Sequence, residues 1–344
     1  MPSSAVAVNG PLLEVRDLSV NFGAFAALAG VSFRLGAGET LGLVGESGSG
    51  KSTLARALLR LIPAAHGTVM WRGVDLLSCD SATMRRQRRD LQMIFQDPLG
   101  SLNPRMTVGE VLTEPLEIFE PSLAAQDRQA QIEEMLERVG LARDAARRYP
   151  HEFSGGQCQR IGIARAMMLR PKLLVCDEPV SSLDVSIQGQ IVNLLMDLQH
   201  EFGTAMLFIS HNLAVVRHIS HRVLVMYLGR IVEDAARDAL FAAPAHPYTR
   251  ALLAAVPDPT RAPAGAPRVA DENLTAAGEP PVGNAVPSGC AFRNRCRYAE
   301  GICEREIPQL EQVSDLHAVA CHRWRALAGT PDPTQSAVRE PRPD

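Results

Sequence analysis

Gly45-Glu46-Ser47-Gly48-Ser49-Gly50-Lys51-Ser52-Thr53 is the stretch of sequence that decides the fold of this chain. Its glycines let the backbone wrap closely, so that several N–H groups can point inward at phosphate oxygens. Lys51 is placed to reach the β- and γ-phosphates of a nucleotide, and the hydroxyl of Ser52 to ligate magnesium. The pattern predicts a phosphate-binding loop made by Gly45, Ser47, Gly48, Ser49, Gly50, Lys51, Ser52 and Thr53.

The residues on either side of this loop support the same interpretation. The apolar run at 40–44 predicts a buried strand, and Leu54, Leu58 and Leu61 fall on one face of a helix that starts at the loop. A strand, a glycine-rich turn and a helix start form the context in which such a motif binds phosphate, because the helix N-terminus attracts anions. A chance glycine turn is the alternative, and these flanking elements disfavour it.

Length, charge and hydropathy limit the other possibilities. The 344 residues suggest two domains, and the net charge of −3 comes without a basic block, so nucleic acid is not an expected partner. Residues 1–10 lack the features of a secretory signal. No run of 18 apolar residues occurs, so we expect any membrane role to come through a partner.

Two further apolar runs end in polar residues that suit phosphate chemistry. The run at 173–178 ends in Asp177 and Glu178, at the strand end where open α/β sheets bind ligands. Asp177 would hold magnesium through water, and Glu178 would polarise the attacking water as general base. The run at 205–211 ends in His211, which could hydrogen-bond the γ-phosphate. Taken alone, Asp177 and Glu178 could equally be an acidic pair in a turn, and His211 could be a structural histidine.

Two other residues are weaker candidates. Gln96 ends a predicted strand, because Pro98 bars its continuation, and a glutamine there can coordinate the metal, orient water or lie on the surface. Phe22 ends an earlier β-rich run, where it could stack on adenine or pack in the core.

The run Ser154-Gly155-Gly156-Gln157 opens an apolar helix and offers a second anion-binding helix start. On its own, such a run would more often be an ordinary helix cap. Two phosphate-type helix starts in one small domain make sense if each chain lends its second start to the nucleotide of a partner chain.

The remaining segments define the predicted domains. We expect an α/β nucleotide-binding domain over 1–243, with an antiparallel β part at 12–39 and a helical part at about 97–168. A hairpin at 222–233 is expected to close its core. Further predictions are a Pro-rich linker at 244–287, a four-cysteine region at 288–325 and a disordered tail at 326–344.

The motifs together resemble those of an ABC transporter ATPase, over about residues 12–233. The resemblance identifies the phosphate loop as the Walker A motif, Gln96 as the Q-loop, 153–157 as the signature and 173–178 as the Walker B motif. Residues 181–184, which end at Asp184, resemble the D-loop, and His211 the switch histidine. It implies a P-loop ABC ATPase core with an antiparallel β subdomain and a helical subdomain, which binds ATP and Mg²⁺.

A narrower resemblance rests on FQDPLGSLNPR at 95–105, HPYTRALL at 246–253 and the terminal cysteines. These look like the ATPase subunits of oligopeptide, dipeptide and nickel importers. The resemblance implies a second ATPase subunit, commonly a different chain, two transmembrane permease subunits and an external substrate-binding protein. Ser154 and Gly156 would then contact nucleotide held by the other subunit.

The function implied is ATP hydrolysis that powers the uptake of di- or oligopeptides, at the cytoplasmic face of the cell membrane. One alternative is the same type of importer carrying nickel, glutathione or another small solute. Another is an ABC ATPase outside transport, associated with nucleic acid or ribosomes. That class would normally need two cassettes in one chain or a long coiled-coil insertion, together with basic surfaces, and none of these is visible in the sequence.

Four of the seven cysteines, Cys290, Cys296, Cys303 and Cys321, cluster near the end of the chain as C-x5-C-x6-C-x17-C. The spacing fits neither a paired C-x2-C zinc ribbon nor the bacterial ferredoxin run. The resemblance implies that some relatives carry a [4Fe–4S] cluster here. Four thiolates suit that cluster or zinc, and unligated thiols are the third possibility.

Overall fold

The computed structural model describes residues 10–255 and 288–328. The predicted Pro-rich linker from residue 256 onward and the predicted tail from residue 329 onward lie outside the described residues. Within the described part, no helix has both the length and the hydropathy needed to span a membrane.

The central feature is an eight-stranded sheet with the strand order β11-β12-β10-β9-β3-β8-β7-β6. Its inner strands are parallel, and β3, β7 and β8 are buried along their whole length. Continuous apolar runs are typical of parallel strands covered on both faces. The strands are β3 (Thr40–Val44), β6 (Leu91–Ile94), β7 (Leu173–Asp177), β8 (Ala205–Ile209), β9 (Arg222–Tyr227), β10 (Arg230–Ala236), β11 (Glu311–Ser314) and β12 (His317–Val319).

A second, antiparallel sheet has the order β2-β1-β4-β5, as the β-rich N-terminal runs predict. Its strands are β1 (Leu13–Phe22), β2 (Phe25–Leu35), β4 (His66–Trp71) and β5 (Val74–Asp75). Helix α1 (Lys51–Leu58) contributes Leu54 and Leu58 to an apolar cluster that joins both sheets. The helix after the phosphate loop is therefore anchored in the core.

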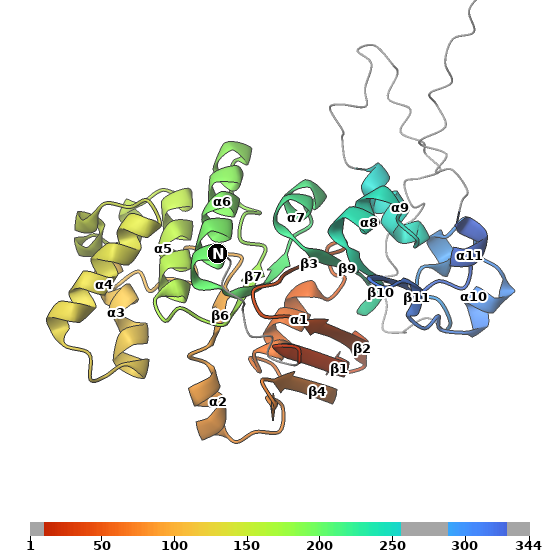
Figure 1. Cartoon of the computed structure of the whole chain (residues 1–344), viewed down its shortest axis with the longest axis horizontal. Helices are drawn as coiled ribbons and strands as arrows, with labels where there is room; N and C mark the ends of the chain where they lie inside the picture. The colour runs from red at the N-terminus through yellow and green to blue at the C-terminus, as the bar shows by residue number, and fades with distance from the viewer. Residues whose placement is uncertain (1–9, 256–287, 329–344) are drawn as a thin grey trace, which may run out of the picture.

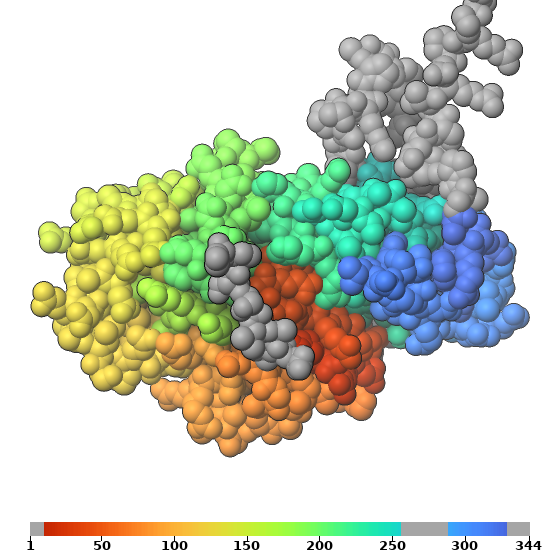
Figure 2. Space-filling view, in the orientation of Figure 1, coloured from red at the N-terminus to blue at the C-terminus, as the bar shows by residue number. Residues whose placement is uncertain are grey.

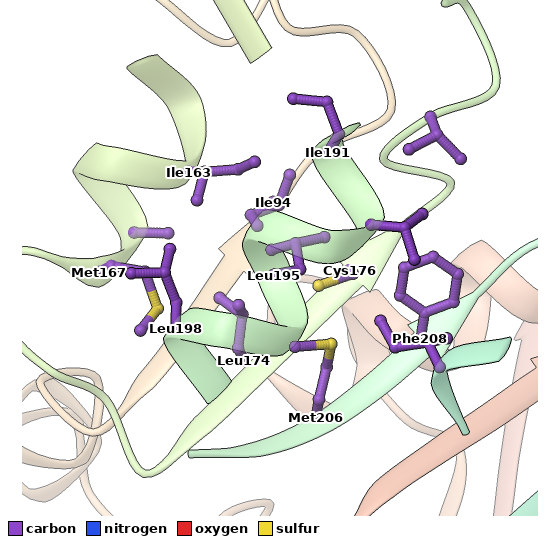
Figure 3. Packing of buried hydrophobic residues seen from close by; sticks show 14 of the residues in the cluster. Ile94, Ile163, Met167, Leu174, Cys176, Ile191, Leu195, Leu198, Met206 and Phe208 are labelled. Carbon is purple, nitrogen blue, oxygen red and sulfur yellow. The ribbon is translucent and has the colours of Figure 1, made fainter. Parts of the chain in front are cut away.

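The helical part lies on one side of the molecule, where α3, α4 and α5 gather at the left of Figure 1. Met167 of α5 lies beside Leu198 of α6, and Leu195 of α6 packs over Cys176 of the sheet, within one apolar cluster (Figure 3). Two of these helices begin at capping boxes, which Thr107 and Glu110 form at α3 and Ser154 and Gln157 form at α5. The helices are α2 (Ser81–Gln87), α3 (Val108–Phe119), α4 (Ala125–Arg138), α5 (Gly155–Met167), α6 (Val185–Phe202) and α7 (Leu213–Ile219), with 3₁₀ turns η1 (Arg143–Arg147) and η2 (Pro150–Glu152).

The C-terminal region continues the central sheet. The predicted hairpin at 222–233 is confirmed as β9 and β10. It does not end the sheet, however, because β12 pairs with the outer edge of β10, with Glu233 opposite Val319. The C-terminal residues, blue in Figure 2, accordingly lie against the part of the chain that ends near residue 255. The elements here are α8 (Arg237–Ala242), α9 (Pro247–Ala254), η3 (Arg293–Arg295), α10 (Gly301–Arg305) and α11 (Trp324–Leu327).

A buried carboxylate fixes this junction. Glu233 is completely buried, and its side chain accepts hydrogen bonds from the backbone N–H groups of Ala245 (2.7 Å) and His246 (3.0 Å). The same carboxylate lies 2.7 Å from Nε2 of His317 in β12. Burial lowers the pKa of His246 to about 4. One side chain of the central sheet thus holds both the segment before α9 and the C-terminal region.

Candidate functional site

The phosphate loop connects β3 to α1 and is packed against the turn between β9 and β10. A Cβ atom at Gly45 would come within 2.2 Å of the carbonyl oxygen of Met226, so only glycine fits there. The N–H of Gly229 donates to the carbonyl of Ser49 at 2.8 Å. Gly50, with φ of 106°, precedes the first turn of α1. Ser47 and Gly48 form the exposed part of the loop, while Ser52 and Thr53, in the first turn of α1, are half-buried.

Lys51 lies inside this loop. Its side chain is buried, and Nζ donates to the carbonyl oxygens of Gly45 and Glu46, each at 2.8 Å. Burial lowers the pKa of Lys51, while the nearby carboxylates of Glu178, Asp177 and Glu46 act in the opposite direction. The ammonium group is therefore held where the loop residues converge, as a compact positive charge.

Ser52 and Asp177 come together from α1 and the end of β7. The Ser52 hydroxyl donates to Oδ1 of Asp177 at 2.8 Å. Asp177 is 1% exposed, and burial raises the pKa of its carboxyl group. A hydroxyl and a desolvated carboxyl group next to a phosphate loop are oxygen ligands of the kind that magnesium prefers. These residues therefore fit the metal that the sequence predicts.

Two of the predicted catalytic residues, Gln96 and His211, contact the third, Glu178. Its Oε2 lies 3.4 Å from Nε2 of Gln96 and 3.2 Å from Nδ1 of His211. The backbone of Glu178 has φ of 49°, in the left-handed region that non-glycine residues rarely adopt and that is most common at functional sites. Its N–H donates to the carbonyl of Ile209 at 3.1 Å, which fixes this turn against the end of β8.

The second predicted anion-binding helix start, at Ser154, lies against the segment around Asp184. Ser154 caps α5: its hydroxyl accepts from the N–H of Gln157, and the Gln157 side chain accepts from the N–H of Ser154. A Cβ atom at Gly155 would lie 3.9 Å from Leu183, and one at Gly156 would lie 2.9 Å from Ile187. These contacts are to the segment around Asp184, the N-cap residue of α6, rather than to the phosphate loop of the same chain. Figure 1 places α5 on the opposite side of α6 from α1.

Phe22 is not a core residue. It is 53% exposed at the end of β1, and its strand partner Phe25 is 45% exposed. Of the two sequence interpretations, packing in the core is therefore wrong, and adenine stacking stays a prediction.

The four C-terminal cysteines are free thiols in one folded region. The N–H of Cys290 donates to the carbonyl of Cys303 at 2.8 Å. Burial raises the pKa of Cys290, Cys296 and Cys321, to about 11 for Cys296 and about 12 for Cys321, and the neighbouring thiols add to each rise. Nevertheless, residues 10–255 and 288–328 contain no group of three or more His, Cys, Asp or Glu side chains arranged to hold a metal ion.

Three residues of the loop's surroundings were not identified from the sequence: Glu46, Tyr248 and Arg295. Both terminal nitrogens of Arg295 contact the Glu46 carboxylate, and the Glu46 N–H donates to the Tyr248 hydroxyl. Arg295 follows Glu46 by 249 positions, so no local pattern links them. Of the three, Tyr248 lies in the segment 246–253, one of the segments that carry the resemblance to importer subunits.

Comparisons with known proteins agree with the geometry. Residues 28–181 match the family described as ABC transporter, and residues 232–303 match the oligopeptide/dipeptide transporter C-terminal region. The chain is 51% identical to the oligopeptide transport ATP-binding protein OppF of Salmonella typhimurium, over 90% of this chain and 95% of that protein. It is also 51% identical to a putative peptide import ATP-binding protein of Brucella ovis, over 91% and 98%.

Solved structures show the same fold. The dimeric structure of MJ0796, a bacterial ABC transporter cassette, has a TM-score of 0.61 at 26% identity and covers 65% of this chain and 98% of that one. CbiO1 from Clostridium perfringens, part of the ABC transporter complex CbiONQ, also has a TM-score of 0.61, at 25% identity, and covers 68% and 91%.

Proposed function

The chain belongs to the ABC transporter family, as an ATP-binding and ATP-hydrolysing subunit of an oligopeptide-type importer, and from this premise we propose how its residues divide the work. The observation that carries the proposal is the convergence of Gln96 and His211 on Glu178, next to the Ser52–Asp177 pair. A carboxylate with two polar partners at a strand end beside a phosphate loop suits a base that activates water.

Within one chain, Lys51 binds the β- and γ-phosphates and Glu178 accepts a proton from the attacking water. Gln96 and His211 orient Glu178 and the water. Ser52 and Asp177, with Gln96, would hold Mg²⁺, which supplies charge stabilisation at the phosphates when bound. The residues act by positioning and electrostatic stabilisation, because phosphoryl transfer asks little covalent chemistry of the protein.

Across a dimer interface, Ser154, Gly155, Gly156 and Gln157 of one subunit bind the nucleotide held by the other, together with Asp184. Support comes from the helix start at Ser154, whose described neighbours belong to 183–187 and not to its own phosphate loop. The solved cassette of similar fold is described as dimeric. Phe22 stacks on the adenine, for which its exposure leaves it free.

The partners in this proposal are a second ATPase subunit of different sequence, two transmembrane permease subunits and an external binding protein that delivers peptides. The subunit is held at the cytoplasmic face of the cell membrane by the permeases. The segment 95–105 supports a docking role, because its apolar residues Phe95 and Leu99 are 37% and 52% exposed.

Purification of the tagged chain in mild detergent tests the assembly. We expect two permeases and a second ATPase to co-purify, and ATP hydrolysis to rise when the binding protein is loaded with peptide. If nickel or glutathione stimulated ATP hydrolysis and peptides did not, the cargo would be that solute and not a peptide. Co-purification with ribosomes or nucleic acid alone, at low salt, would reject the importer assignment.

We further propose that Cys290, Cys296, Cys303 and Cys321 hold a [4Fe–4S] cluster, with zinc as the alternative. Support comes from four free thiols in one small region and from the hydrogen bond between the N–H of Cys290 and the carbonyl of Cys303, which joins two of the four residues. Because the described residues contain no preformed metal-binding group, binding requires the side chains to turn toward one another.

Metal analysis after anaerobic purification distinguishes these cofactors. We expect brown protein containing iron and acid-labile sulfide, which is lost in Cys296→Ser and retained in the control Cys79→Ser, because Cys79 lies outside this region. Colourless protein with one zinc per chain would establish the alternative. Protein free of both metals, with its thiols reduced, would contradict metal binding.

A further inference from the structure

The C-terminal region contacts the phosphate loop at Glu46. Nη1 and Nη2 of Arg295 lie 2.7 and 2.9 Å from the two carboxylate oxygens of Glu46. Such a two-pronged arginine–carboxylate pair fixes orientation as well as distance, and it is stronger than a single ion pair. The Arg295 side chain is 11% exposed and that of Glu46 31%, so solvent screens the pair only partly.

Arg295 is itself held in place. Its guanidinium lies 5.7 Å from the ring centre of Tyr227 and 5.8 Å from that of Phe292, and Nη1 donates to the Tyr227 hydroxyl at 3.3 Å. Tyr227 and Phe292 are buried and meet edge to face. The pair therefore rests on a rigid aromatic support.

The backbone of Glu46 is fixed as well. Its N–H donates to the hydroxyl of Tyr248 at 2.8 Å, and its carbonyl accepts from Nζ of Lys51 at 2.8 Å. Tyr248 is 1% exposed and packs against Tyr227 and Phe292. Side chain, N–H and carbonyl of this one residue are thus bound by the C-terminal region, by α9 and by the phosphate-binding lysine.

We propose that Arg295 is a positioning residue for ATP binding, which acts through Glu46 on the phosphate loop and on Lys51. Two physical effects support this. The pair neutralises a carboxylate that would otherwise repel a triphosphate bound to the same loop. It also holds the carbonyl of Glu46 at the position where it directs Lys51, and the geometry of such a loop sets the strength of phosphate binding.

This inference rests on the proposed function, since it requires the loop to bind ATP. It goes beyond that function because it assigns a role in nucleotide binding to a residue of the C-terminal region. Arg295 touches no reacting atom, so its loss should change the affinity for ATP more than the chemical step.

The test uses the full-length chain and its assembled transporter. For Arg295→Gln we expect the Kd of a fluorescent ATP analogue and the KM for ATP to rise about tenfold, the range seen when a supporting partner of a ligand-binding group is lost. The kcat should stay within about twofold. Arg295→Lys, which keeps the charge but not the two-pronged contact, should lie between. Arg297→Gln is the matched control, because that exposed arginine stacks on Tyr298 instead.

A double-mutant cycle tests the path through Glu46. Adding Arg295→Gln to Glu46→Gln should weaken ATP binding no further, since the contact is already broken. The proposal would be overturned if the fold-losses in ATP affinity of the two single variants multiplied in the double variant. It would also be overturned by an Arg295→Gln variant that binds ATP as the wild type does. If Arg295→Gln fails to fold, a folded Arg295→Lys variant with wild-type Kd overturns it equally. Wild-type protein that bound no ATP would instead reject the proposed function.

Discussion

Glu178→Gln is expected to bind ATP normally and to hydrolyse it about 10²–10⁴-fold more slowly, the contribution that a general base typically makes. Glutamine has the same shape as glutamate and can keep hydrogen bonds to Gln96 and His211, whose side chains contact Oε2 of Glu178. It cannot accept the proton of the attacking water. Single-turnover ATPase measurements on the assembled transporter would separate this loss in the chemical step from any change in binding.

The same variant should accumulate as a closed dimer, because ATP that is bound but not hydrolysed keeps the two subunits together. Size-exclusion chromatography with ATP and Mg²⁺ measures this. Glu137→Gln is a suitable control, since Glu137 is an exposed residue of α4 that pairs with Arg143. Unchanged turnover in Glu178→Gln would show that another group activates the water.

Lys51→Ala is expected to weaken ATP binding by about 10–100-fold, which corresponds to about 1.5–3 kcal/mol for the loss of a hydrogen bond to a charged group. The reason is local: Lys51 is buried in the loop, and its Nζ already occupies the point where the carbonyls of Gly45 and Glu46 converge. Equilibrium binding of an ATP analogue to the purified chain measures the effect.

The chain provides its own control for this substitution. Lys172 is the only other lysine, and its side chain is exposed just before β7, so Lys172→Ala should bind ATP as the wild type does. The free energy of unfolding of Lys51→Ala should change by less than about 1 kcal/mol, because relief from burying an ammonium group offsets its two lost hydrogen bonds. Wild-type affinity in Lys51→Ala would remove the basis of the proposed mechanism.

The central site could be predicted because its residues follow local patterns. Lys51 stands in a glycine-rich turn between an apolar strand and a helix, and Asp177 and His211 each follow an apolar run closely. Parallel strands bring such carboxyl ends to one edge of the sheet, so separate motifs meet without any further signal. The contacts of Ser52 with Asp177 and of His211 with Glu178 are the result.

What could not be predicted depends on contacts between distant segments. β12 has only three residues, and the sequence of His317–Val319 is too short to predict that this strand pairs with β10. Because the apolar hairpin β9–β10 resembles the end of a sheet, the sequence predicts a sheet edge at β10, whereas β12 and β11 continue the sheet beyond it. The pairing of Arg295 with Glu46 has the same origin, since one charged residue among many carries no information about its partner.

The junction at Glu233 has a consequence for the order of events during synthesis. Glu46, Lys51 and the inner strands leave the ribosome long before the residues that complete them, because Arg295 and His317 are among the last described parts of the chain. Domains generally fold as units while the chain grows, so this nascent cassette must wait with an unfinished sheet edge and an unpaired carboxylate at its loop. On the role proposed for Arg295, the loop reaches its full affinity for nucleotide only after the C-terminal region has been synthesised.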